Sequence, residues 1–139
     1  MKRNGRLALA LHTLSHMASD PARTQTSADI AQHAGTNAVV VRRVLGRLRD
    51  ANLLHSEKGH AGGWRLAQNP DDISLADVYL ALDQRTVDTV VDTCSLSCAI
   101  EHALHDRVSA VMADVEQTLV ERLGETTIAD ICSAPARTA

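Results

Sequence analysis

The stretch SADIAQHAGTNAVVVRRVLGRLRDANLLHSEKGHAGGWRLA, residues 27–67, decides the fold of this chain. Its first part, SADIAQHAG, predicts a short helix that is capped by Ser27 or Thr26 and ends at Gly35. The residues of this helix expected to face inward are Ile30, Ala31 and Ala34. Asn37 is a good N-cap for a longer helix, AVVVRRVLGRLRDAN. A short helix, a tight turn with glycine and a longer helix are typical of a helix-turn-helix.

The residues that follow predict a wing. LLHSEKGHAGGWRLA should form two short strands, about 53–56 and 63–67, around a glycine-rich tip. A hairpin directly after a helix-turn-helix makes a winged helix. In the longer helix before it, the positions expected to face the core are Val40 or Val41, Val44, Leu45 and Leu48.

The flanking segments complete the predicted architecture. Leucines and alanines predict a first helix over about 5–18, and Ser74 with Asp77 resembles a capping box for a helix at 75–82. We predict a mainly α-helical fold with a small β-wing, in which a winged helix-turn-helix domain precedes a long dimerisation helix. The predicted segments are the DNA-binding domain 1–82, a linker 83–95, the dimerisation helix with a C-terminal turn 96–131, and a tail 132–139.

Composition narrows the class of protein. The 139 residues, 45% of them apolar, are enough for one buried core. Residues 1–66 carry ten Lys and Arg and four Asp and Glu, which gives this half a net charge of +6. Residues 67–139 carry four Lys and Arg and thirteen Asp and Glu, which gives a net charge of −9. This asymmetry indicates a half that faces a polyanion. The chain has no apolar run of the roughly 18–20 residues that a membrane span needs, and its three cysteines are too few for a disulfide scaffold. We therefore expect a cytoplasmic protein with no membrane partner.

Arginines on the longer helix carry the predicted DNA contacts. Residues near the start of a recognition helix normally reach bases, and those further along, such as Arg47, hold phosphate. Because aromatic side chains that could stack on unpaired bases are scarce, the expected partner is double-stranded DNA. A merely solvated basic face is the alternative. The predicted contacts are Thr36, Asn37, Val39, Arg42, Arg43 and Arg47, with Lys58 and His60 on the wing tip.

Residues 30–82 closely resemble the bacterial Rrf-two family of winged-helix regulators. That family includes the iron–sulfur cluster regulator, a nitric-oxide-sensitive repressor and a cysteine-metabolism repressor. The most specific signature is a G-x-x-G-G-aromatic-x-L-A wing followed by P-x-x-I-[ST]-L-x-D-V, and the similarity covers about residues 3–125. The resemblance implies a dimeric transcription factor, usually a repressor, that binds a palindromic operator.

The resemblance also implies roles for single residues. By motif match, the family's base-reading segment corresponds to Asn37, Val39, Arg42 and Arg43. Lys58 falls where many members have a wing arginine that enters the minor groove. The wing departs from the family's common GPGGGY form, whose Pro, first inner Gly and Tyr are replaced here by His60, Ala61 and Trp64.

A long apolar stripe predicts the dimer. Apolar residues at 96, 100, 104, 108, 111, 115, 119 and 123 fall on one side of a helix. Such a stripe on a helix that follows a small domain favours a partner helix, and a symmetric homodimer would also supply two recognition helices for two half-sites. Burial of the stripe within its own chain is the alternative.

The segment CSLSCAIEHALH, residues 94–105, leaves several interpretations open. Cluster-binding members of the resembled family use three cysteines just before this helix, so an iron–sulfur cluster here would need His102, Cys132 or the other subunit besides Cys94 and Cys98. Zinc shared by neighbours such as Cys98 and His102 is a second alternative. We favour a protein without cofactor and with a redox- or electrophile-sensing Cys94, for which Cys98 is the resolving partner. The remaining alternative is that both cysteines only pack the helix start.

Other classes of function receive less support. The chain has no phosphate loop, no G-x-S-x-G, no H-E-x-x-H and no evident acid pair, so we do not expect an enzyme. A winged-helix protein-interaction module without DNA binding is a further alternative, against which the arginine-rich helix argues. No motif identifies an inducer.

Overall fold

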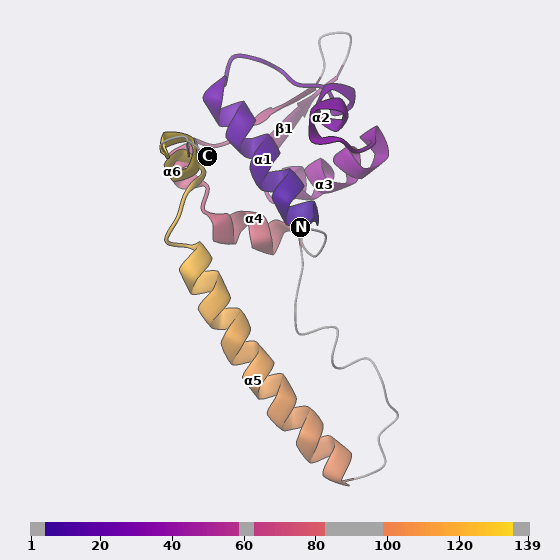
Figure 1. The fold of residues 1–139 in the computed structure, drawn as a ribbon, viewed down its shortest axis with the longest axis vertical. Coiled ribbons are helices and arrows are strands. Elements are labelled where there is room, and N and C mark those ends of the chain that lie inside the picture. Colours follow the sequence, from indigo (N-terminus) through magenta and orange to yellow (C-terminus); the bar gives the residue numbers. More distant parts are fainter. Residues whose placement is uncertain (1–4, 59–62, 83–98, 135–139) are drawn as a thin grey trace, which may run out of the picture.

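The computed structural model describes residues 5–58, 63–82 and 99–134, and His60, Cys94 and Cys98 lie outside them. The chain forms α1 (Gly5–Ser19), α2 (Ser27–Ala34), α3 (Ala38–Asp50), β1 (Leu54–Glu57), β2 (Gly63–Leu66), a short 3-10 turn η1 (Pro70–Asp72), α4 (Leu75–Ala81), α5 (Ala99–Leu123) and α6 (Ile128–Ser133). In Figure 1, α5 extends away from a unit that the other elements form together. The predicted fold, mainly α-helical with a small wing and a long C-terminal helix, is confirmed.

Side-chain caps fix the ends of the helices as the sequence predicts. Thr26 caps α2: its Oγ1 accepts from the Asp29 backbone N–H at 3.1 Å, and the Asp29 carboxylate accepts from the Thr26 N–H. Gly35 ends α2 with φ 71°, a left-handed conformation in which glycine carries no steric penalty. Asn37 caps α3, and Ser74 with Asp77 forms the predicted capping box of α4. The helix-turn-helix is therefore built by local signals.

The end of α3 is stabilised by a Schellman motif without glycine. Asn52 adopts φ 63°, and its N–H donates to Arg49 O at 2.9 Å. The next residue, Leu53, donates to Leu48 O at 2.9 Å, and both leucine side chains are buried. Asparagine tolerates this left-handed conformation better than most residues. The motif turns the chain from the recognition helix directly into the wing.

One hydrophobic core unites the winged helix. The apolar face of α3 is confirmed, with Val41, Val44, Leu45 and Leu48 all buried, whereas Val40 is 36% exposed. Leu14 and Met17 of α1 pack into the same core.

The expectation that Ala34 faces inward is wrong. Ala34 is exposed because it lies in the last turn of α2, where it lines an open groove beside α1 rather than the core.

The wing is joined to the chain that precedes α2. β1 and β2 pair in antiparallel register from Leu54 opposite Leu66 to Glu57 opposite Gly63. On its other edge, Trp64 of β2 donates its N–H to Gln25 O at 2.8 Å and accepts from Gln25 N at 3.4 Å. The Trp64 indole N–H also donates to Ser27 Oγ at 2.9 Å. The hairpin is thus fastened to the start of α2.

The C-terminal turn differs in position from the sequence-based division, which groups it with the dimerisation helix. The TIADIC segment forms α6, and it packs against α1 (Figure 1). Ile128 is fully buried in the core, and its N–H donates to Ile73 O at 2.9 Å. Leu75 N donates to Thr126 O at 2.9 Å. These contacts make α6 part of the winged-helix unit.

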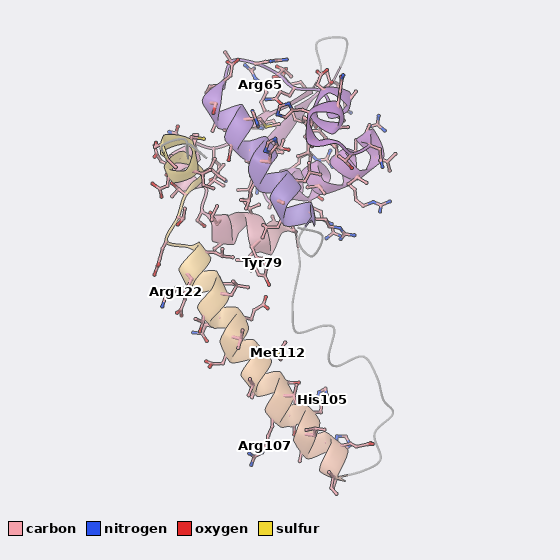
Figure 2. The ribbon with its side chains drawn as sticks, in the orientation of Figure 1. Arg65, Tyr79, His105, Arg107, Met112 and Arg122 are labelled. Carbon is pink, nitrogen blue, oxygen red and sulfur yellow. The ribbon has the colours of Figure 1, made fainter. Side chains whose placement is uncertain are left out.

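α5 stands apart from this core. None of its residues is buried, and in Figure 2 its side chains, among them His105 and Met112, project around the helix. Tyr79 of α4 lies on the side toward α5 and donates its hydroxyl to Glu116 Oε1 at 3.1 Å. Residues 96–98, the expected start of this helix, lie outside the described residues. No described helix is both long and apolar enough to cross a bilayer.

Gly63→Ala should lower the free energy of unfolding by about 1–3 kcal/mol, the usual range for overpacking. A Cβ at this position would lie 2.6 Å from Gln25 O, a backbone atom that the strand pairing holds in place. Urea unfolding of the purified protein measures the change. Gly46→Ala is the matched control, since among the described residues a Cβ there meets only the Arg49 Nη2 atom at 4.0 Å. This control should be neutral or stabilise α3 by about 0.5–1 kcal/mol. Equal stabilities of the two variants would contradict the proposed role of Gly63.

Candidate nucleic-acid interface

The face of α3 that points away from the core carries the predicted DNA contacts. Core residues follow the helical period, so the residues between them face outward. Val39, an apolar side chain, is 59% exposed there. The structure places all six predicted residues of this region on the exposed side of the turn and helix: Thr36, Asn37, Val39, Arg42, Arg43 and Arg47.

Three of these residues offer guanidinium groups that are free of carboxylates. Within the part of the chain that the structure describes, Arg42, Arg43 and Arg47 form no ion pair. Arg49 is different, because its guanidinium lies 3.6 Å from the Asp50 carboxylate and 5.9 Å from the centre of the Trp64 ring. Arg49 is thus engaged within the fold, whereas the other three can donate to an external acceptor.

Asn37 has a structural role in addition to its predicted contact with bases. Its Oδ1 accepts from the Val40 backbone N–H at 3.0 Å, which satisfies one of the unpaired amides at the start of α3. The amide nitrogen of the side chain is left to donate to a ligand. A base contact through Asn37 would therefore use this nitrogen or the second lone pair of Oδ1, while the bond to Val40 keeps the helix start in place.

The wing contributes one described basic residue near its tip. Lys58 directly follows β1 and is exposed, whereas His60 lies outside the described residues. At the base of the wing, Arg65 Nη1 lies 3.2 Å from Glu57 Oε1 and Arg65 Nη2 donates to Ala22 O at 3.3 Å. Arg65 therefore braces the hairpin, a role that the sequence does not reveal. Lys58 extends the basic surface beyond α3.

A cluster of three histidines is the group that sequence reasoning missed. His12 and His16 lie one turn apart on α1, and His33 reaches them from α2. The Nε2 atoms of His16 and His33 are 3.2 Å apart, and the His12 and His33 rings stack with centroids 5.2 Å apart. Partial burial, followed by the neighbouring charges of His16 and His33, lowers the pKa of His12. The i, i+4 spacing of His12 and His16 was the available signal.

His102 and Cys132, which the sequence offers as alternative additional ligands, lie far apart along the chain. His102 lies in the first turn of α5 and Cys132 in α6, beyond the other end of that helix. At about 1.5 Å per residue, the distance along α5 from His102 to Leu123 is roughly 31 Å. One chain therefore cannot bring His102 and Cys132 to the same metal centre. Cys132 is exposed, and its thiol donates to Ser15 O at 3.4 Å.

Comparison with known proteins identifies the family. Residues 3–134 match the Rrf2 family, described as an iron-dependent transcriptional regulator. The chain belongs to the Rrf2 family. This is the family whose wing and base-reading motifs the sequence resembles, and it consists of transcriptional regulators rather than enzymes. The predicted family and the expectation that the chain is not an enzyme are confirmed.

Individual Rrf2 relatives agree with this assignment. YwnA of Bacillus subtilis, named as an HTH-type transcriptional regulator, is 32% identical over 92% of this chain and 95% of its own length. The HTH-type regulator IscR of Photobacterium profundum is 27% identical over 75% of this chain, which spans only 64% of that relative. CymR, the global cysteine regulator of Bacillus subtilis, has the same fold, with a TM-score of 0.64, 21% identity, and coverage of 98% of this chain and 99% of CymR.

Proposed function

We propose that this DNA-binding transcriptional regulator is a repressor that binds a palindromic operator as a homodimer. The observation that carries the proposal is a set of arginines on the outward face of α3 that have no ion pair among the described residues, within the winged helix of an Rrf2 chain. Occupation of a promoter by such a protein blocks access to it. A role on genomic DNA also assigns the protein to the cytoplasm.

Position along α3 divides the arginines into two groups. Arg42 and Arg43 lie in the first half of the helix, near the Asn37 cap, where a recognition helix meets base edges. Arg47 lies in the last turn, where contacts to phosphate are usual. Lys58 on the wing would follow the backbone or enter the adjacent minor groove. Thr36 and Val39 complete the surface that would enter the major groove.

Arg43→Ala should cost roughly 1–3 kcal/mol on the operator and relax the preference at one base pair, because a bidentate arginine–guanine contact is lost. Arg47→Ala should weaken operator and random DNA alike, and it should lower the slope of log affinity against log salt by about one unit. Fluorescence anisotropy with promoter fragments, measured at several salt concentrations, separates the two effects.

Arg122→Ala is the matched control for these variants. Arg122 is an exposed arginine in the last turn of α5, far from α3 along the chain, and its removal should leave both affinities unchanged. Equal losses on operator and random DNA for Arg43→Ala would show that Arg43 holds phosphate. If neither Arg43→Ala nor Arg47→Ala changed binding, the protein-interaction alternative would replace the DNA-binding role of α3.

The proposed dimer is supported by the exposure of α5. Its apolar stripe lies open in the single chain: Ile100 is 78% exposed, Val111 62% and Val115 53%. A long apolar helix face in contact with water is unfavourable, whereas the same face against a second copy would be buried. Two-fold symmetry would then present two copies of α3 to half-sites about 34 Å apart.

Val111→Glu combined with Val115→Glu should give a folded monomer with weak operator binding. The two charges would face each other across the helix pair, but they would not disturb the core because both positions are exposed in the single chain. Sedimentation analysis at about micromolar concentration measures the change in mass. The control, Ala113→Glu with Gln117→Glu, adds the same charge to exposed positions on the opposite side of α5. Sedimentation of the native protein as a monomer would contradict the proposal.

The proposed signal is oxidation or electrophilic modification of Cys94, with Cys98 as the resolving thiol. Support comes from position in the sequence, because both residues lie directly before α5, which begins at Ala99. A covalent change at this point could rotate or splay the proposed dimer helix and so change the distance between the two recognition helices. The protein would then bind DNA without any cofactor.

Mild peroxide or quinone should reduce operator affinity of the native protein but not of Cys94→Ser. Cys132→Ser is the control and should respond to the oxidant as the native protein does, because Cys132 lies on α6 and is not part of the proposed sensor. Thiol titration before and after treatment identifies the modified residues. An unchanged oxidant response in Cys94→Ser and Cys98→Ser would leave both cysteines with a packing role. Stoichiometric iron and sulfide in the purified protein would instead favour a cluster-binding regulator, in line with the family's iron-dependent description.

A further inference from the structure

We propose that His12, His16 and His33 form a binding site for one divalent transition-metal ion of the zinc class, between α1 and α2. The site is separate from the cysteines before α5 and does not depend on the proposed sensor. It consists of three imidazoles from two helices, and all three side chains are exposed to solvent, so that an ion can enter directly.

The helix geometry brings the three side chains together. His12 and His16 are four residues apart, which places them on the same face of α1. His33 lies in the last turn of α2, the first helix of the helix-turn-helix, and faces them. The three pairs of ring centroids are 4.5, 4.6 and 5.2 Å apart. Two helices thus hold the rings close before any ion is added.

The spacing of the nitrogen atoms fits a tetrahedral ion. Zinc binds histidine nitrogen at about 2.0–2.1 Å, so two nitrogens of a tetrahedral site lie about 3.3 Å apart. The Nε2 atoms of His16 and His33 are separated by 3.2 Å, which is close to that value. One ring nitrogen from each of the three residues lies within 4.8 Å of the others. Small rotations of the His12 side chain would complete the third corner, and water would occupy the fourth.

The chemistry of the pair also favours a cation. Two ring nitrogens can form a hydrogen bond only when one carries a proton and the other a lone pair. A metal ion between the Nε2 atoms of His16 and His33 would instead accept a lone pair from each nitrogen, so neither needs to carry a proton. Two grooves that adjoin the three histidines are lined by Asp20 and Asp29 and by Arg6 and Arg23, so their charged side chains balance. A positive ion is therefore not opposed by the charges around the site.

The ligand set predicts the type of metal. Three imidazoles without a thiolate suit zinc, nickel, copper and cobalt ions, whereas magnesium and calcium prefer oxygen ligands. Cys132 lines a groove together with His12 and His16, but its sulfur is not among the atoms of the cluster. Cobalt bound at the site should therefore show the visible d–d bands of a tetrahedral centre without a thiolate-to-metal charge-transfer band.

Zinc titration of the untagged, reduced, full-length protein tests the proposal by isothermal titration calorimetry. We expect one ion per chain. His16→Ala and His33→Ala should each weaken binding by at least about 100-fold, because loss of a mere outer-shell partner already costs about 10- to 100-fold. His55→Ala is the matched control, an exposed histidine on β1, and should bind as the native protein does. Circular dichroism without metal checks that each variant is folded, and His12→Gln serves as a further variant should an alanine variant not fold.

Two further results distinguish this site from a site at the cysteines. The Cys94→Ser, Cys98→Ser double variant should keep full zinc affinity, and the cobalt complex should lack the thiolate band. Absence of zinc binding by the native protein would overturn the proposal, as would unchanged binding in His33→Ala and His16→Ala. Loss of binding in the double cysteine variant with the histidines intact would also overturn it, because the ion would then belong to the thiols.

Discussion

The backbone pairing of Trp64 with Gln25 holds the DNA-binding unit in one arrangement. It forms an isolated β-bridge that joins the segment before α2 to β2, so the base of the wing is tied to the helix-turn-helix. The Trp64 side chain strengthens the junction, because its indole donates to Ser27 at the start of α2 while Arg49 from α3 lies over its ring. Trp64 therefore joins the base of the wing to α3 and to the start of α2 within the chain itself.

Much of the fold follows from local signals that can be read in the sequence. The caps of α2, α3 and α4 depend on residues within three positions of each other, such as Asn37 with Val40. The buried face of α3 follows from the helical period. The exposed arginines of that helix follow in turn, because once the core face is known the opposite face is known as well. The boundaries of α1 to α4 and of the two wing strands could therefore be predicted to within a residue or two.

The features that escaped prediction depend on contacts between residues distant in the sequence. His12 and His16 could be placed on one helix face, but the approach of His33 depends on how α2 packs against α1. The inward position expected for Ala34 failed for a related reason, since helical period alone does not tell where the covering element ends. Arg65 could have been taken for another wing contact, yet Glu57 and the Ala22 carbonyl engage it. Periodicity and capping describe single elements, whereas these contacts join elements.

The return of α6 to α1 gives the DNA-binding unit a discontinuous path through the sequence. Ile128 belongs to the core and donates its N–H to Ile73, although the whole of α5 separates it in the sequence from the other core residues. During synthesis this core is complete only once the ribosome has also produced α5 and the start of α6. A gene fragment that stops after α4 would encode every element of the wing and the helix-turn-helix, yet it would leave an apolar hole where Ile128 belongs. The complete core of this DNA-binding fold therefore needs the whole segment from α1 to α6.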